Sequence, residues 1–264
     1  MIVVCVAGAT GWTGRAVAEA AHAAPDLTLG GAVARSGAGR DLGEVCGGEP
    51  IGVTVAATVE DALAGVDVLV DYTAPSAVKP NTLAAIERGA GVVIGTSGLS
   101  AADFADIDAA ARSAGVGVVA AGNFSLTAAM AQAAALLAAR FLPQREVIDY
   151  ASAGKPDAPS GTARELAERL AEVSATELTV PVGDTLGHPE ARGATIAGTQ
   201  VHSLRLPSFV VSTEVVFAAP DERLTIRHDA GNSPAPYVAG TLLAVRAVGE
   251  VIGLVRGLDT LLLR

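Results

Sequence analysis

The segment from Gly154 to Ala163 offers the clearest chemistry in this chain. It reads Gly-Lys-Pro-Asp-Ala-Pro-Ser-Gly-Thr-Ala and lies directly before a predicted helix. Lys155 is one of only two lysines among 18 basic residues, so the position of its ammonium group is informative. A helix N-terminus attracts anions, and a lysine facing it completes a site for a carboxylate or dicarboxylate. Alternatively, Thr162 and Glu165 match a capping box that only begins the helix, and the two interpretations are compatible.

A second candidate site is the glycine-rich turn near the start of the chain. Gly8, Gly11 and Gly14 are spaced as Gly-x-x-Gly-x-x-Gly between a predicted strand and a predicted helix. Small residues let the backbone approach a pyrophosphate, and the helix N-terminus supplies N–H groups. The context favours a dinucleotide site, and a glycine-rich turn without a ligand is the alternative. The predicted cofactor contacts are Gly8, Ala9, Thr10, Gly11, Trp12 and Thr13, with Trp12 packing beside the cofactor.

The end of the second predicted strand indicates which nucleotide binds. An acidic residue there would bind the ribose 2′-hydroxyl of NADH, whereas an arginine accommodates the 2′-phosphate of NADPH. Residues 34–40 contain no acid and two arginines, Arg35 and Arg40. We therefore predict NADPH, with Arg35 at the phosphate and NADH as the second choice. Arg40 can equally be a solvated loop charge.

Two further turns follow predicted strands, at the sheet edge where open α/β folds bind ligands. They are Gly95-Thr96-Ser97 and Ala121-Gly122-Asn123-Phe124. Their small residues and exposed backbone groups could hold a nicotinamide and its ribose. Taken alone, each is an ordinary turn between a strand and a helix.

The elements that must position these residues alternate through the first half of the chain. Strands are predicted at 2–7, 27–34, 67–72, 91–95 and 117–121, and helices at 15–24, 59–64, 81–88 and 101–114. The run 2–7 is continuously apolar, as expected for a strand buried on both faces. This alternation predicts a doubly wound, parallel α/β sheet.

The pattern changes in the second half. A helix at 127–141, a strand at 146–151 and a helix at 160–173 precede strands at 200–206, 209–218 and 223–228. Consecutive strands without crossover helices predict a mixed or antiparallel sheet in a smaller α+β domain. Loops are predicted at 174–177 and 187–198, and a helical tail at 236–252. We expect a dinucleotide-binding domain at 1–124, a substrate-binding and oligomerisation domain at 125–235, and a C-terminal helix returning to the first domain at 236–264.

The composition excludes several functional classes. The chain has 264 residues, is half hydrophobic and carries a formal net charge of -10. Such acidity argues against nucleic acid or an anionic membrane as a partner. Two cysteines cannot form a disulfide framework, which together with the absence of a targeting or membrane-spanning pattern predicts a cytoplasmic protein. The four histidines are scattered, so no metal site is expected.

The chain resembles the dihydrodipicolinate reductase family over essentially its whole length. The segments that carry the resemblance are Gly8-Ala9-x-Gly11-x-x-Gly14, Asp71-Tyr72-Thr73-x-Pro75, Gly95-Thr96-Ser97-Gly98, Asn123-Phe124-Ser125, Lys155 to Ala163, His202-Ser203-x-Arg205-Leu206 and Leu224 to His228. The resemblance implies a Rossmann-like first domain, a homotetramer and NAD(P)H-dependent reduction of a cyclic imine dicarboxylate in the lysine and diaminopimelate pathway. It implies cofactor contacts from the turns named above. Substrate contacts are expected from Ser152, Lys155, Ser160, Gly161 and Thr162, with Lys155 as the catalytic residue.

One departure from the family pattern affects the chemistry. The family carries a His-His pair shortly before the lysine, and its first histidine is regarded as the general acid. Those positions are Ala151 and Ser152 here. Lys155, Tyr150 or a bound water could supply the proton instead. His202 and His228 lie in predicted strands and are interpreted as packing residues.

Three functional hypotheses remain open. The first is a dihydrodipicolinate reductase that tolerates the loss of the His-His pair. The second is a paralogous reductase acting on another small imine or enone carboxylate, which the missing pair favours. The third is a catalytically silent nucleotide-binding relative, against which the intact segment around Lys155 argues.

Overall fold

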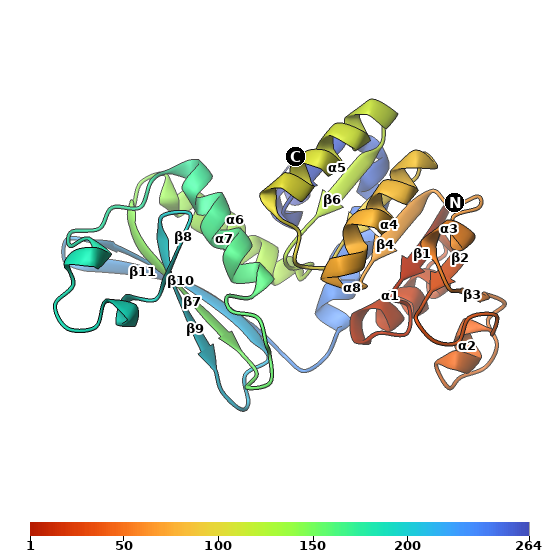
Figure 1. Ribbon diagram of the computed structural model, residues 1–264, viewed down its shortest axis with the longest axis horizontal. Helices are drawn as coiled ribbons and strands as arrows, with labels where there is room; N and C mark the ends of the chain where they lie inside the picture. The colour runs from red at the N-terminus through yellow and green to blue at the C-terminus, as the bar shows by residue number, and fades with distance from the viewer. Residues whose placement is uncertain (264) are drawn as a thin grey trace. The chain divides into compact units, whose positions relative to one another are not determined.

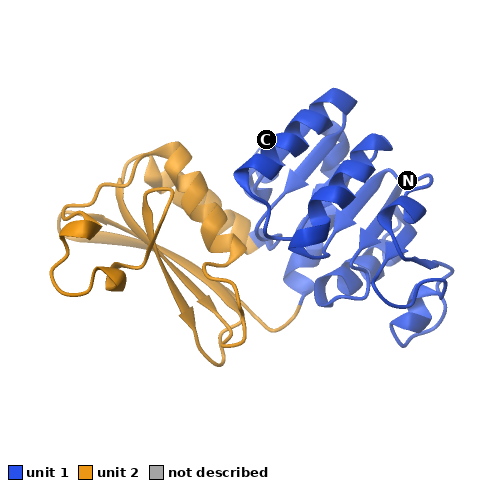
Figure 2. Ribbon diagram, in the orientation of Figure 1, with its two compact units in different colours: residues 1–126, 234–264 blue, residues 127–233 orange. Residues whose placement is uncertain are grey.

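The computed structural model describes residues 1–263, which divide into two compact units (Figure 2). Unit 1 comprises residues 1–126 together with the chain from residue 234 onward, and unit 2 comprises residues 127–233. The chain therefore leaves unit 1, builds unit 2 as one continuous segment and then returns. The assignment of nucleotide binding to unit 1 and substrate binding to unit 2 stays a prediction. In the described part of the chain, no helix has the length and apolar character needed to cross a membrane.

Unit 1 contains the predicted doubly wound sheet, with seven parallel strands in the order β12-β6-β5-β4-β1-β2-β3 (Figure 1). The strands are β1 (Ile2–Ala7), β2 (Leu27–Val33), β3 (Val55–Ala56), β4 (Val68–Asp71), β5 (Gly91–Ile94), β6 (Gly117–Ala120) and β12 (Gly253–Arg256). The register aligns Ala7, Asp71, Ile94 and Ala120 on four neighbouring strands. The turns after these strands therefore open at one edge of the sheet.

Helices cover both faces of this sheet, as a two-sided buried sheet requires. They are α1 (Trp12–Ala23), α2 (Leu42–Val45), α3 (Val59–Ala62), α4 (Pro75–Glu87), α5 (Ala101–Ala114), α8 (Ala235–Ala247) and α9 (Leu258–Leu262). Side chains from α3, α4 and α5, such as Val59, Val78 and Ile107, share one core with Leu69 and Val92 of the strands. Helices α1 and α8 pack against each other on the opposite face.

Unit 2 contains a five-stranded mixed sheet in the order β11-β10-β7-β9-β8. Its strands are β7 (Gln144–Ala151), β8 (Ala194–Ile196), β9 (Thr199–Arg205), β10 (Val211–Ala219) and β11 (Glu222–Ala230). Only β7 and β9 are parallel; the other neighbours are antiparallel. Burial alternates strictly along β7, because α6 (Leu126–Ala139) and α7 (Gly161–Val173) cover one face alone. We call this the covered face and the opposite one the outer face.

Several expectations about the elements were wrong. The tail after residue 235 is not one helix: α8 ends at Ala247, and the chain then forms edge strand β12 and the short helix α9. The segment expected as a loop at 187–198 contains β8, and β3 is a strand that was not predicted. Helix α1 begins at Trp12 and α4 at Pro75, several residues before their predicted starts.

Candidate active site

The glycine-rich turn joins β1 to α1 with the geometry that a pyrophosphate requires. Gly8 has φ +83°, and a Cβ there would overlap the carbonyl oxygen of Tyr72. A Cβ on Gly14 would overlap the carbonyl oxygen of Gly8, so the helix can approach the turn only with glycine there. No side chain caps α1, and its first N–H groups have no acceptor within the helix. The turn therefore fits an anionic group of a dinucleotide.

Arg35 lies beside this turn. The carbonyl oxygen of Val33, the last residue of β2, accepts hydrogen bonds from the amides of Gly8 and Ala9 at 2.9 and 3.1 Å. Arg35 follows two residues later and its side chain is exposed. No described residue forms an ion pair with it. A guanidinium in this place fits a ribose 2′-phosphate.

The buried carboxylate of Asp71 holds one of the two predicted nicotinamide turns, the one that follows β5. Asp71 ends β4 and is completely buried. Its Oδ1 accepts hydrogen bonds from the hydroxyls of Thr73 and Thr96, both at 2.7 Å, and its Oδ2 accepts one from Asn81 at 2.8 Å. Its backbone oxygen accepts the amides of Gly95 and Thr96. Asp71 thus fixes the position of the 95–97 turn.

The last predicted cofactor turn, 121–124, follows β6. The amide of Ala121 donates to Ile94 at 3.3 Å, and the Asn123 side chain accepts the amide of Ser125 at 2.8 Å. Phe124 is only 2% exposed and its ring packs edge-on against Tyr72, with centroids 6.3 Å apart. The Phe124 ring therefore supports the turn, and a cofactor can contact Phe124 only through its backbone atoms.

Lys155 lies in the loop between β7 and α7 of unit 2. Its amide donates to the carbonyl oxygen of the exposed Ser152 at 3.0 Å, which closes a turn. Its ammonium Nζ is 2.8 Å from Asp157 Oδ1, and the two side chains are 28% and 44% exposed. An incoming carboxylate can therefore reach the ammonium group, where it competes with Asp157 for the charge.

The loop is held by a buried ion pair behind it. Asp149, fully buried on the covered face, accepts the amide and the hydroxyl of Ser160 at 2.8 and 2.7 Å. Its Oδ2 also accepts Arg205 Nη2 at 2.8 Å. The same guanidinium nitrogen donates to the backbone oxygen of Asp157 at 2.6 Å. Asp149 and Arg205 together therefore set where Lys155 and the start of α7 lie.

The predicted cap of α7 was wrong in its residues. Ser160, not Thr162, is the N-cap, and its hydroxyl accepts the amide of Ala163 at 3.3 Å. Glu165 is buried and accepts Gln132 Nε2 at 3.1 Å. Because the amide and hydroxyl of Ser160 are both used internally, Ser160 is a weaker candidate for substrate contact than the sequence suggested.

The residues in place of the histidine pair differ in exposure. Ala151 is completely buried and Ser152 is exposed. Tyr150, the sequence-based candidate for proton donation, points to the outer face, where its hydroxyl donates to Glu214 Oε2 at 3.1 Å. Burial raises the pKa of Tyr150, and the Glu214 carboxylate raises it further. Tyr150 is therefore a poor proton donor for a substrate at Lys155.

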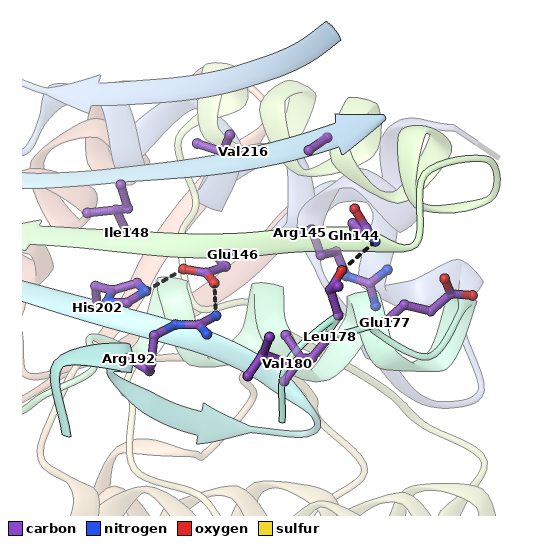
Figure 3. A pocket seen from close by; sticks show the side chains of 12 residues that line it. Gln144, Arg145, Glu146, Ile148, Glu177, Leu178, Val180, Arg192, His202 and Val216 are labelled. Carbon is purple, nitrogen blue, oxygen red and sulfur yellow. Dashed lines mark hydrogen bonds and ion pairs between the residues drawn. The ribbon is translucent and has the colours of Figure 1, made fainter. Parts of the chain in front are cut away.

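A cavity of about 690 Å³ on the outer face has no connection with the predicted site (Figure 3). Figure 3 shows the carboxylate of Glu146 between His202 and Arg192, at 2.7 and 2.6 Å. None of the residues predicted to bind substrate or cofactor lines it. His202 thus has a carboxylate partner remote from Lys155.

The sequence analysis named Asp71 and Arg205 only within the segments of the resemblance, and it assigned no role to them or to Asp149. Asp71 and Asp149 each follow directly on apolar residues within a predicted strand, and that signal could have marked them as buried carboxylates with specific partners. Thr96 lies 25 residues after its partner Asp71, and Arg205 lies 56 residues after Asp149. Sequence spacing alone could not identify pairs so far apart.

Comparisons with known proteins agree over the whole chain. Residues 2–124 match the family model for the N-terminus of dihydrodipicolinate reductase, and residues 122–262 match that for its C-terminus. A 4-hydroxy-tetrahydrodipicolinate reductase of Synechococcus elongatus is 40% identical, covering 99% of this chain and 98% of its own. The enzyme of the same name from Thermosynechococcus vestitus is 37% identical, with 99% and 97% covered. A dipicolinate-bound dihydrodipicolinate reductase from Paenisporosarcina has a TM-score of 0.78 at 27% identity, covering 98% of this chain and 99% of its own.

Proposed function

The chain belongs to the dihydrodipicolinate reductase family, and from this premise we propose that it is an NADPH-dependent 4-hydroxy-tetrahydrodipicolinate reductase. The family match makes it an NAD(P)H-dependent oxidoreductase. The observation that carries the proposal is the accessible ammonium of Lys155, anchored next to the N-terminus of α7. A cation beside a helix N-terminus suits a substrate with two carboxylates.

Each part of the chain has a defined task in this proposal. Lys155 binds one carboxylate of the cyclic imine and draws electron density from the ring. Gly161 and Thr162 bind the second carboxylate through their backbone amides at the start of α7. The turn from Gly8 to Thr13 and Arg35 bind the nucleotide, whose nicotinamide supplies the hydride when bound. The other predicted contacts, Gly95 to Ser97 and Ala121 to Phe124, orient the nicotinamide and its ribose.

A second candidate function is reduction of a different small imine or enone carboxylate. The observation that favours it is the buried Ala151 followed by Ser152, where the family has its histidine pair. Neither side chain can donate a proton as an imidazolium does. A positioned general acid commonly accelerates a reaction by about 10²–10⁴-fold, so its loss favours a different substrate. We also propose the homotetramer and the cytoplasmic location expected from the sequence.

Steady-state turnover with freshly generated 4-hydroxy-tetrahydrodipicolinate separates the two functions. We expect turnover, with kcat/KM higher for NADPH than for NADH. Nucleotide binding without turnover of this substrate would contradict the first function and support the second. Ala151→His combined with Ser152→His then tests the missing pair: a rise in kcat shows that the lost histidines limit the rate, and no rise shows that the proton comes from elsewhere.

A further inference from the structure

A small cavity lies on the covered face of unit 2, beside the proposed substrate site. It has a volume of about 20 Å³ and lies between α6, α7 and strands β10 and β11. Its polar lining consists of Gln132, Thr162, Thr213 and His228. Thr162, one of the proposed substrate contacts, therefore belongs to both the substrate site and this cavity.

The hydroxyl of Thr213 lines this cavity and needs a hydrogen-bond partner. Thr213 is 7% exposed, and no described residue provides a hydrogen-bond partner for its buried Oγ1. A buried hydroxyl without a partner costs about 1–3 kcal/mol. A water needs about 10–15 Å³ and two to four polar partners, and the cavity meets both conditions. One ordered water in the cavity would satisfy this hydroxyl.

His228 is placed to use that water. It lies directly opposite Thr213 in the β10–β11 ladder and is half-buried. It is the one titratable side chain lining the cavity. The reduction needs a proton. Ala151 and Ser152 carry no imidazole, Tyr150 points to the outer face, and Lys155 is assigned to a substrate carboxylate.

We propose that His228 supplies the proton of the reduction through one water bound by Thr213, with the hydroxyl of Thr162 as the final donor. This inference rests on the proposed function. It replaces the sequence-based interpretation of His228 as a packing residue.

The proton transfer balances without any further reactant. Loss of the 4-hydroxyl group of the substrate as water gives the conjugated ring. Hydride then adds to this ring and leaves an electron-rich carbon. The imidazolium of His228 gives its proton to the water, the water gives one of its protons to Thr162, and the Thr162 hydroxyl proton forms the new carbon–hydrogen bond. The neutral imidazole then takes a proton from solvent.

The groups around His228 determine the pH dependence. The lining residues from α7 and β10 are uncharged, and the buried Glu165 accepts a hydrogen bond from Gln132, which also lines the cavity. On its own strand, Arg227 and Asp229 pair with each other. Burial lowers the pKa of His228, and the charge of Asp229 opposes this in part. A bound dicarboxylate favours the imidazolium and raises that pKa again.

The test compares His228→Gln with the matched control His202→Gln, which changes a histidine of the same sheet that faces outward. We expect His228→Gln to lower kcat about 100-fold or more. Because the acid must be protonated, kcat/KM of the unmodified protein falls as pH rises through a value below the ordinary histidine pKa. The corresponding fall in kcat occurs at higher pH, because the bound substrate raises the pKa of His228. Both pH dependences are absent from His228→Gln. The control His202→Gln should retain kcat within about twofold of the unmodified protein and show the same pH profile.

Thr213→Val provides a second variant of nearly the same shape that folds without the orphan hydroxyl. It should lower kcat about tenfold and reduce the solvent deuterium isotope effect, with no loss of thermal stability. A His228→Gln protein that retains kcat within threefold, with an unchanged pH profile, overturns this inference alone. Absence of turnover by the unmodified protein overturns the proposed function and this inference together.

Discussion

At the scale of single residues, Lys155 already has a carboxylate partner before substrate arrives. Asp157 Oδ1 lies 2.8 Å from its ammonium nitrogen, and both groups remain partly exposed. Ion pairs of this kind contribute about 0–1 kcal/mol, so a substrate carboxylate can displace Asp157 at little cost. The pair therefore holds the ammonium group in position without blocking it.

Asp157→Asn tests this exchange. The variant removes the competing charge, so we expect KM for the substrate to fall by up to about fivefold while kcat changes by less than twofold. Steady-state kinetics at saturating NADPH measure both constants. A rise in KM would show that Asp157 orients Lys155 and does not compete with the substrate.

Nucleotide preference also belongs to single residues. We expect Arg35→Ala to raise KM for NADPH about 10–100-fold, because a charged hydrogen bond contributes about 1.5–3 kcal/mol, and to leave KM for NADH unchanged. Arg40→Ala is the matched control from the same loop and should affect neither constant. Equal effects on NADPH and NADH in Arg35→Ala would contradict a contact to the 2′-phosphate.

At the scale of elements, the two faces of β7 carry carboxylates with different roles. Asp149 on the covered face is fully buried and binds Arg205 and Ser160. Glu146 on the outer face is 37% exposed and binds Arg192 and His202. Breaking a buried ion pair by removing one charge costs far more than breaking an exposed pair, because the remaining charge stays desolvated.

Asp149→Asn should therefore lower the free energy of unfolding by about 3–5 kcal/mol, whereas Glu146→Gln should lower it by about 1 kcal/mol or less. Urea denaturation provides both values. Asp149→Asn should also raise KM for the substrate, since the loop carrying Lys155 loses its anchor. Similar unfolding free energies for the two variants would show that Asp149 does not hold the loop as described.

The elements also show which features the sequence could predict. β1 was evident because six apolar residues precede a glycine turn, a local signal that burial on both faces explains. β12 was not, because its four residues follow an Ala- and Leu-rich helix and become a strand only by pairing with β6, more than 130 residues earlier. The cap of α7 was misassigned for a similar reason. Ser160 is favoured over Thr162 because Asp149 fixes it, and that contact is tertiary.

At the scale of the whole molecule, the nucleotide and the substrate are assigned to different compact units. Unit 1 contains the glycine-rich turn, Arg35 and Asp71 with its hydrogen-bond partners. Unit 2 contains Lys155, Asp149 and His228. Each unit has its own sheet and its own buried core. Ligands should therefore stabilise the two units separately.

Calorimetry with and without NADPH tests this division. At a nucleotide concentration about 100 times its Kd, binding adds about 2.7 kcal/mol of stability, which should raise the transition of unit 1 by about 5–10 °C. The transition of unit 2 should move by no more than about 2 °C. A shift of both transitions by the same amount would contradict the assignment of the nucleotide to unit 1.

The account as a whole depends most on the ammonium group of Lys155, and the chain offers a matched control in its other lysine, Lys79, which pairs with Asp103 and Asp106 in unit 1. The most direct measurement is kcat/KM for 4-hydroxy-tetrahydrodipicolinate in Lys155→Met and Lys79→Met, with NADPH binding followed by the fluorescence of Trp12, the single tryptophan. We expect Lys155→Met to lower kcat/KM about 10²–10³-fold with unchanged NADPH affinity, and Lys79→Met to retain it within about twofold. A Lys155→Met protein with kcat/KM within threefold of the unmodified protein would contradict the account.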